Sequence, residues 1–562
     1  MSKMSMRIIV LVLVLISGTG EGLAAEKDPS YDPIVFELLK SSGVNFEIEP
    51  SRTDRRHQPE TMISGIALLD YDNDGWLDIY VLSGATMPGL KKTSESHYNR
   101  LFRNNGDLTF EDVTKRAGVE GRGYTHGVIA ADYDNDGDMD LFISALKENI
   151  LYRNEGDGTF ADVTSDLGLA EPDPKYGVLW SVGAAFFDYD RNGWLDLFVS
   201  NYCVWDPETE PACGPKNSPD YCHPQHYDGL PNSLFSNDGG KRFIDVSEAS
   251  GIRSHIGKGM GLGVADFDED GFTDIYVAND TVPAFLFRNR QDGTFEEIAF
   301  PSGTAYTYSG AAVSGMGVDA KDVNNDGLPD IFVAAMTNEA MPFYVNQGDG
   351  FFDEMTAPSK LAMMTRDRTG WSNGITDLNN DGWKDLFIAS GDVMDPRGAF
   401  GERVLQPNTL FVNLKNGKFA DGAPTAGEEF RTTKAVHRGA AFGDLDNDGR
   451  IDAIVTSLSG PTEIWRNVSS ESNHWLVINT IGTKGNRDGM GAKIKVTTAS
   501  GTQYNHVNTA VGYGCSSDKR VHFGLGKDKA ISEIQITWLS GIVQTLKNVP
   551  ADQFLVVTEP ES

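Results

Sequence analysis

Short apolar runs alternate with polar, Gly-rich segments along most of the chain. Around residues 70–78, an apolar run (66–69) precedes the polar segment, and a run rich in β-branched and aromatic residues (77–82) follows it. Such runs are typical of strands, so the polar segment between them is predicted to be a hairpin loop. The pattern recurs along the chain, and together with 61 Gly residues it predicts an all-β protein.

The polar segment occurs in seven copies close to Asp-x-Asp-x-Asp-Gly-x-x-Asp, which we call acidic loops 1 to 7 in chain order. Oxygen ligands at positions 1, 3, 5 and 9, with a Gly at position 6 that permits a sharp turn, suit Ca²⁺. An EF-hand would instead have Glu at position 12 and flanking helices, whereas position 12 of loop 1 is Val81 in a predicted strand. The sequence therefore predicts up to seven Ca²⁺ sites. The predicted ligands are Asp70, Asp72, Asp74 and Asp78; Asp132, Asp134, Asp136 and Asp140; Asp188, Asp190, Asn192 and Asp196; Asp266, Asp268, Asp270 and Asp274; Asp322, Asn324, Asp326 and Asp330; Asp377, Asn379, Asp381 and Asp385; and Asp444, Asp446, Asp448 and Asp452.

A second signature follows the loops, first as residues 101–107 with 110–114 and then as 151–157 with 160–164. It predicts two more strands joined by an Asn/Gly/Asp turn, so one repeat supplies four strands. Loop starts are 55 to 78 residues apart, and four-stranded units at this period predict a seven-bladed β-propeller. Small residues five positions before each loop would fit where inner strands crowd at the axis. They are Gly65, Gly127, Gly183, Gly261, Gly317, Ser372 and Gly439.

The last repeat lacks its outer strand, because no matching segment follows residues 464–467. Residues 36–44 resemble the outer-strand segment 243–252, so we expect residues 33–45 to supply that strand and close the ring. From about residue 472 the repeat stops, and alternating strands with Gly-rich turns predict a small C-terminal β-sandwich. The expected domains are thus a propeller at 26–470 and a sandwich at 471–559.

The N-terminus and the net charge indicate where the protein acts. Lys3 and Arg7, the apolar residues 8–16 and the small residues before Glu26 predict a secretory signal peptide at residues 1–25 and a secreted, extracellular or periplasmic protein. No later apolar run approaches the length of a membrane span. The net charge of −33 makes nucleic acid an unexpected partner, since phosphate would be repelled.

Two insertions, 201–231 and 391–407, interrupt the repeat. Cys213 and Cys222 lie in the first insertion and are predicted to form a disulfide, since an exported, irregular segment has few other means of holding its shape. The alternative joins both cysteines to His223 and His226 in a zinc or copper site. Cys203 and Cys515 either pair across domains or stay as buried thiols.

The repeats in residues 60–470 resemble the FG-GAP or VCBS-type repeats of integrin α-subunit propellers. The segments 474–476, 482–488, 491–492, 522–526 and 538–541 resemble the ASPIC/UnbV domain, and the combination is similar to a secreted, cartilage acidic protein-like family. The resemblance implies export and calcium binding but no shared reaction. The Asn residues in loops 3, 5 and 6 depart from the all-Asp form, which would weaken those three sites.

The sequence therefore predicts a secreted binding or adhesion module for an extracellular or cell-surface protein or glycan. Ca²⁺ would stiffen the blade hairpins, and folding stability would depend on free calcium. The alternative is a secreted hydrolase or lyase acting at the propeller face, with Tyr221, His223, His226 and Tyr227 as candidates. The chain contains neither a Gly-x-Ser-x-Gly nor a His-Glu-x-x-His motif in support of this alternative.

Overall fold

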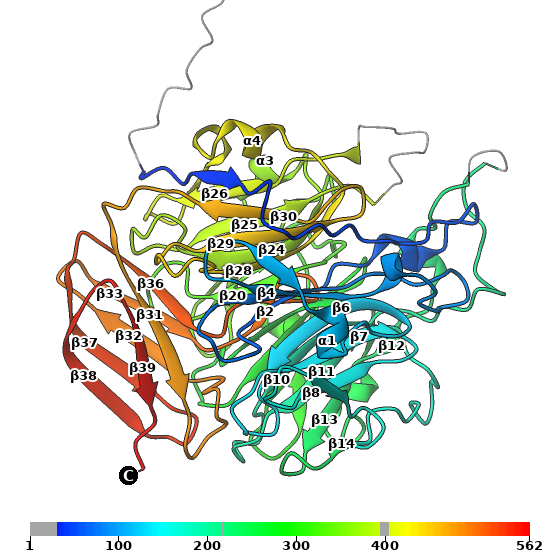
Figure 1. The fold of residues 1–562 in the computed structure, drawn as a ribbon, viewed down its shortest axis with the longest axis horizontal. Coiled ribbons are helices and arrows are strands. Elements are labelled where there is room, and N and C mark those ends of the chain that lie inside the picture. The colour runs from blue at the N-terminus through cyan, green and yellow to red at the C-terminus, as the bar shows by residue number, and fades with distance from the viewer. Residues whose placement is uncertain (1–30, 216–218, 394–403, 562) are drawn as a thin grey trace, which may run out of the picture.

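The computed structural model describes residues 31–215, 219–393 and 404–561. The predicted signal peptide at 1–25 lies outside these residues. Figure 1 shows a molecule built from antiparallel sheets with only short helices, so the prediction of an all-β fold is confirmed. The α-helices are α1 (Thr114–Ala117), α2 (Ala299–Ser302), α3 (Leu361–Thr365) and α4 (Glu428–Thr432). Single 3-10 turns lie at Gln58–Thr61, Glu95–His97, Pro224–His226, Ile252–Ser254 and Ala423–Thr425.

Seven of the described sheets carry one acidic loop each, and we number them 1 to 7 like the loops. Sheet 1 holds β2 (Ile66–Leu69), β3 (Asp78–Val81), β4 (Arg100–Asn104) and β5 (Phe110–Asp112). Sheet 2 holds β6 (Tyr124–Ala131), β7 (Asp140–Leu146), β8 (Ile150–Asn154) and β9 (Phe160–Asp162). Sheet 3 holds β10 (Ser181–Phe187), β11 (Asp196–Asn201), β13 (Ser233–Asn237) and β14 (Phe243–Asp245). Sheet 4 holds β16 (Gly259–Ala265), β17 (Asp274–Asn279), β18 (Phe285–Asn289) and β19 (Phe295–Glu297).

The remaining repeats follow the same order of strands. Sheet 5 holds β20 (Val318–Lys321), β21 (Asp330–Val333), β22 (Phe343–Asn346) and β23 (Phe352–Glu354). Sheet 6 holds β24 (Gly370–Thr376), β25 (Asp385–Ser390), β26 (Thr409–Asn413) and β27 (Phe419–Asp421). Sheet 7 holds β28 (His437–Gly443), β29 (Asp452–Ser457), β30 (Glu463–Asn467) and β1 (Phe36–Leu38). A separate pair, β12 (Leu230–Pro231) and β15 (Ile256–Gly257), lies beside sheet 3.

The sheets form a closed ring, as expected for a β-propeller. The first strand of each sheet contacts the first strand of the next, and β28 of sheet 7 contacts β2 of sheet 1. The outer strand of sheet 7 comes from the other end of the chain, because β1 pairs antiparallel with β30 and places Phe36 opposite Asn467. This pairing covers an edge of β30 that would otherwise be exposed.

Residues after the ring form two further sheets, drawn orange to red in Figure 1. One holds β31 (His474–Ile481), β36 (Val521–Gly526) and β39 (Gln553–Thr558). The other holds β32 (Lys493–Thr497), β33 (Thr502–His506), β37 (Ala530–Thr537) and β38 (Val543–Pro550). Leu476 and Ile478 of the first sheet share a buried cluster with Ile494, Ile534 and Ile536 of the second, so the two sheets share one core.

A hairpin from this C-terminal region enters the centre of the ring. It consists of β34 (Ala510–Val511) and β35 (Cys515–Ser516), and its two strands together contact the inner strands of all seven sheets. Its backbone bonds to the ring directly, since Gly512 N donates to Val318 O (2.7 Å) and Val128 N donates to Gly514 O (3.0 Å). The chain therefore fills the axis of its own propeller.

The small inner-strand residues make room for this hairpin as well as for one another. A Cβ on Gly261 would lie 2.6 Å from Gly512 O, and a Cβ on Gly127 would lie 2.9 Å from Gly514 Cα. The sequence attributed these glycines to crowding between inner strands. Part of that crowding comes from a segment that the sequence assigned to another domain.

Candidate metal centres

Each acidic loop is a tight turn held by its own first carboxylate. In loop 1, Asp70 accepts hydrogen bonds from Asp74 N (3.0 Å) and Gly75 N (2.9 Å). The bond from the position-6 Gly to the position-1 Asp occurs in all seven loops. Gly75 has a φ of 91°, in a region that is strained for any residue with a side chain. This geometry explains the Gly at position 6.

The position-9 carboxylate anchors the loop to its sheet. Asp78 is the first residue of β3, and it accepts hydrogen bonds from Tyr71 N (3.0 Å) in the loop and Asn104 N (2.8 Å) at the end of β4. The same two bonds occur in every sheet. Burial raises the pKa of Asp78 to about 8, and the neighbouring charges of Asp72 and Asp70 act in the same direction. The carboxylate is therefore costly to hold ionised without a cation nearby.

The position-1 carboxylates of loops 2 to 7 are also buried. Burial raises the pKa of Asp188 and of Asp444 to about 7 and that of Asp377 to about 8. Burial and the nearby Asp488 raise the pKa of Asp132 to about 8. The loops thus concentrate carboxyl groups where water cannot screen them, and a bound cation would favour their charged form.

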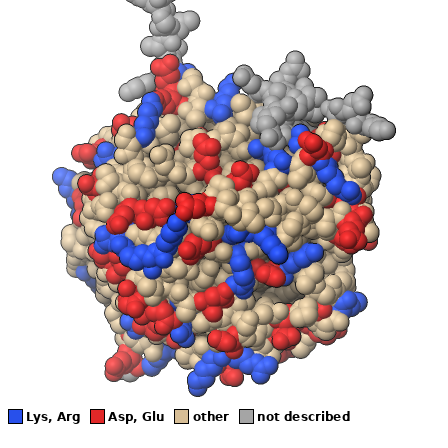
Figure 2. Space-filling view, turned by 45° about the vertical axis from the view of Figure 1, so that its right-hand side comes forward, with Lys and Arg blue, Asp and Glu red and all other residues tan. Residues whose placement is uncertain are grey.

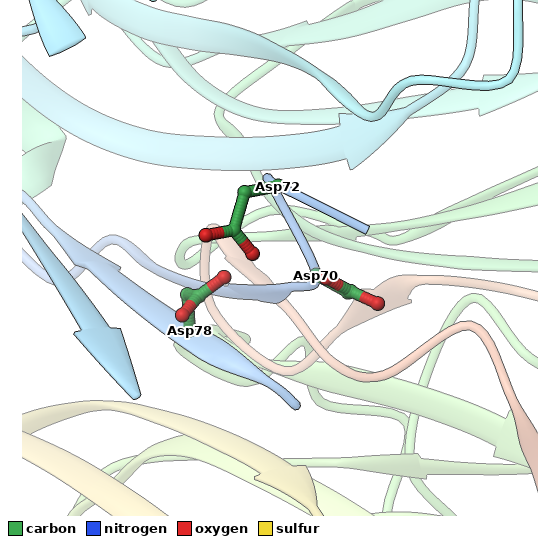
Figure 3. A group of neighbouring side chains, drawn as sticks. All are labelled: Asp70, Asp72 and Asp78. Carbon is green, nitrogen blue, oxygen red and sulfur yellow. The ribbon is translucent and has the colours of Figure 1, made fainter. Parts of the chain in front are cut away.

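Five loops bring three carboxylates together, with one oxygen of each within 4.8 Å of the others. In loops 1, 3, 4 and 7 the three are positions 1, 3 and 9, and in loop 2 they are positions 1, 3 and 5. Figure 3 shows loop 1, where the carboxylates of Asp72 and Asp78 face each other and Asp70 lies beside them. Loops 5 and 6 have Asn324 and Asn379 at position 3, so their described carboxylates form no such group.

Several of these oxygens are buried and have no hydrogen-bond partner. They are Oδ1 of Asp72, Asp134 and Asp446 at position 3, and Oδ1 of Asp266 at position 1. A buried polar atom without a partner costs free energy, and an ionised one costs more. A hard cation held by carboxylate oxygens would satisfy all four, and such oxygens are the ligands that Ca²⁺ prefers. The residues present therefore fit the predicted ion in the loops that contain these atoms.

The structure also shows a site residue that the loop pattern alone did not predict. The third strand of every sheet ends in Asn, and its side chain donates to a carbonyl in the loop of the preceding sheet. Asn154 Nδ2, for example, donates to Tyr71 O at 2.8 Å. The equivalent donors are Asn104, Asn237, Asn289, Asn346, Asn413 and Asn467. These bonds link the seven loops around the ring, and the recurring Asn was the signal for them in the sequence.

The C-terminal sheets lie over the acidic loops. Asp132 N donates to Asp488 Oδ2 at 2.8 Å, and Lys493 Nζ lies 2.6 Å from Asp266 Oδ2. Buried Lys384 in acidic loop 6 donates to Tyr504 O at 2.9 Å. A cavity of about 250 Å³ remains between loops 4 and 5 and β32 and β33. Ions in the loops would therefore lie close to the contact between the ring and the C-terminal region.

The described part of the insertion at 201–231 contains a disulfide and buried tyrosine hydrogen bonds. Cys213 and Cys222 form a disulfide, so the zinc or copper alternative, which needs both thiolates, is wrong. The hydroxyl of buried Tyr227 donates to Glu210 Oε1 at 2.8 Å, and the hydroxyl of Tyr221 donates to Glu60 Oε2 at 3.2 Å.

The remaining residues of the metal-site, enzyme and second-disulfide alternatives lie in the following positions. His223 Nδ1 accepts a hydrogen bond from Gln225 N at 3.2 Å, and His226 is exposed. Cys203 and Cys515 are buried free thiols, so their pairing across domains is wrong. The second insertion, 391–407, falls mostly outside the described residues. The pairing of Glu210 with buried His57 could not be predicted from a local pattern, because the two residues lie 153 positions apart.

The described residues contain no helix long and apolar enough to cross a membrane. On the face drawn in Figure 2, acidic and basic side chains are interspersed.

Comparison with known families identifies the repeats. A model of the FG-GAP-like repeat matches residues 70–143, 266–333, 322–388 and 377–455, and a model described as ASPIC and UnbV matches residues 482–562. The chain is therefore a propeller protein with FG-GAP repeats followed by an ASPIC/UnbV domain. It is homologous to cartilage acidic protein 1, with 26% identity to the Homo sapiens protein over 527 residues, which cover 90% of this chain and 73% of that relative.

Other similarities are more distant. Integrin alpha-4 of Xenopus laevis is 25% identical over 235 residues, which cover 38% of this chain and 21% of the relative. Among solved structures, an Agrocybe aegerita protein that recognises non-reducing terminal N-acetylglucosamine matches with a TM-score of 0.39 and 17% identity, covering 66% of this chain and 88% of that one. A structural similarity at this level carries no functional information.

Proposed function

We propose that this protein is a secreted, calcium-binding β-propeller that binds an extracellular or cell-surface protein or glycan. The observation that carries the calcium assignment is the set of buried carboxylate oxygens without partners in loops 1, 2, 4 and 7. The kinship with cartilage acidic protein 1 and the repeats shared with integrin alpha-4 support a binding or adhesion role.

The proposed ligands are the side chains at positions 1, 3, 5 and 9 of each loop. A bound Ca²⁺ supplies the positive charge that lets several carboxylates stay ionised at short range. The position-9 Asp transmits the resulting order to the third strand, and the strand-end Asn transmits it to the preceding loop. Calcium would in this way stiffen the ring and preorganise its surface, which lowers the entropy lost when a partner binds.

The partner surface is proposed to lie away from the acidic loops, because the C-terminal sheets cover these loops and a hairpin fills the axis. The insertion 201–231 begins at the end of β11 that is distant from loop 3. A cavity of about 660 Å³ opens nearby between sheets 2 and 3, with Arg122, Lys147 and Phe235 in its lining. Long loops on a rigid scaffold are common binding sites, which supports this placement.

Affinity capture tests the proposal directly. Immobilised mature protein, freed of metal and then equilibrated with either Ca²⁺ or EGTA, would be exposed to defined panels of glycans and extracellular proteins. We expect at least one specific partner to be retained in Ca²⁺ and released by EGTA. Equal retention in both buffers, or no retention by either panel, would count against a calcium-dependent binding module.

A further inference from the structure

The residue before the strand-end Asn varies among the sheets. It is Arg in sheets 1, 2, 4 and 7 and an uncharged residue in sheets 3, 5 and 6. These residues are Arg103, Arg153, Ser236, Arg288, Val345, Val412 and Arg466. In each sheet this residue precedes the Asn whose backbone N–H donates to the position-9 Asp of the acidic loop.

The variation follows the number of ligand carboxylates in the loop. Each loop with Asp at all four proposed ligand positions (1, 3, 5 and 9) belongs to a sheet with Arg at this position. Each loop with one Asn (Asn192, Asn324 or Asn379) belongs to a sheet with Ser or Val. Four ligand carboxylates with one Arg, and three ligand carboxylates with none, both carry a formal charge of −3. The ligand positions and the strand residue therefore sum to the same charge in all seven sheets, whereas the other loop positions add Asp138, Arg191, Glu269, Lys384 and Arg450.

The contacts in sheets 1 and 7 show how the compensation works. Arg103 Nε lies 2.5 Å from Asp72 Oδ2, and the same guanidinium pairs with Asp74. Arg466 lies 2.9 Å (Nε) and 2.7 Å (Nη2) from Asp446 Oδ2. In both loops the guanidinium takes one oxygen of the position-3 Asp, and the other oxygen, Oδ1, is the buried atom without a partner.

Sheets 2 and 4 place Arg at the same strand position with a different nearest partner. Arg153 lies 2.7 Å from Glu155, and Arg288 lies 2.6 Å from Glu296. Each of these two arginines is paired with a glutamate outside the loop and does not orient the position-3 carboxylate by direct contact. All four arginines follow the sequence pattern, and the orienting contact holds for Arg103 and Arg466.

We propose that these arginines are positioning residues of the calcium sites, each offsetting the fourth ligand carboxylate of its loop, so that the Asn-containing loops are not weaker for having one ligand carboxylate fewer. The inference rests on the proposed function, and it replaces the expectation that the Asn-containing loops are weak sites. The physical reason is that one unit charge a few ångströms from a divalent ion changes its dissociation constant by about tenfold or more at a protein surface. Without the arginine, the fourth ligand carboxylate would raise the Ca²⁺ affinity of an all-Asp loop above that of an Asn-containing loop.

Loop 1 offers the sharpest test, because Trp76 at position 7 can sensitise the luminescence of a Tb³⁺ ion bound in place of Ca²⁺. The part of the signal that disappears in Trp76→Phe belongs to loop 1. Arg103→Val and Asp72→Asn each change the site charge by one unit in opposite directions, and the double variant reproduces the composition of sheets 5 and 6 at these two positions. The Ca²⁺ concentration that displaces half of the loop-1 signal gives the relative affinity of each form.

We expect Asp72→Asn to raise that concentration about tenfold and Arg103→Val to lower it by a similar factor, as one unit charge predicts. The double variant should return to within about threefold of the original protein, because its two charge changes cancel. Arg100→Val, on the same strand but paired with Asp112, is the matched control and should not shift the displacement.

Two results would overturn the inference. One is a double variant that binds as weakly as Asp72→Asn alone. The other is an Arg103→Val variant that melts at a lower temperature in Ca²⁺ and in EGTA alike, with no shift in displacement, which would mean that Arg103 only packs against the strand. The proposed function fails separately if the original protein gives no Trp76-dependent signal that Ca²⁺ can displace.

Discussion

Single residues of the acidic loops have roles that depend on their charge and backbone geometry as much as on packing. The position-6 Gly supplies a left-handed turn, and the position-9 Asp joins the loop to two strands. Both roles are visible in the sequence, because each depends on residues within one repeat. The match between the strand arginine and the number of ligand carboxylates is also visible in the sequence, but only when the third strand is compared with its loop.

Buried His126 gives a prediction at this scale. Burial lowers its pKa to about 3, below the value near 6.5 expected in the unfolded chain. The unfolded state therefore takes up a proton as the pH falls below about 6.5 while the folded state does not, and folding stability is lost in that range. Between pH 6.5 and pH 5 this histidine should cost about 2 kcal/mol.

Denaturant unfolding of His126→Phe at both pH values measures this contribution. The variant should lose less stability between pH 6.5 and pH 5 than the original protein does. His226→Phe, at an exposed site, is the control and should leave the pH dependence unchanged. An equal loss in His126→Phe and the original protein would refute the assignment.

At the scale of elements, the strands of each repeat could be predicted from the sequence, whereas the hydrogen bonds between different repeats could not. The four strands of each repeat and the pairing of β1 with β30 follow from local patterns and from the likeness of residues 36–44 to another outer strand. The bond from each strand-end Asn to the preceding loop joins residues at least 79 positions apart, and no local pattern predicts its acceptor. The pairing of Glu210 with His57 was hidden for the same reason.

Asn237 tests the linkage between loops. Its side chain is buried and donates to Tyr133 O in loop 2 and to Leu195 O in its own loop, both at 2.9 Å. Asn237→Ala leaves two buried carbonyls without these donors and should lower the free energy of unfolding by about 2–3 kcal/mol. Chemical denaturation in Ca²⁺ measures the loss.

The matched control for Asn237→Ala is Asn105→Ala, which removes an exposed side-chain bond to Thr109 and should cost less than about 0.5 kcal/mol. A loss of equal size in the two variants would mean that the linkage between loops adds nothing to stability.

The whole molecule is a ring with its own chain through the centre. Family resemblance and period predicted the ring and the C-terminal β-sheets, but not the entry of the β34–β35 hairpin into the axis. That hairpin carries no repeat signal, and its contacts are with inner strands about seventy or more residues away. The axial space is therefore not free for a partner in this arrangement.

Gly512 tests the axial hairpin. A Cβ at this residue would lie 2.0 Å from Ser372 Oγ, so Gly512→Val should displace the hairpin from the ring. Cys515, which is 3% exposed, should then react with a thiol reagent under native conditions at least about tenfold faster than in the original protein. Gly485→Val, where a Cβ meets nothing within 4 Å, is the control. Equal labelling rates in all three proteins would show that the hairpin does not depend on this close fit.

The central claim is that the acidic loops hold calcium, and equilibrium dialysis of metal-free protein against Ca²⁺ tests it most directly. We expect up to seven ions per chain, one for each acidic loop. Protein that is verified as folded and metal-free, yet takes up no Ca²⁺ at millimolar concentration, would contradict it.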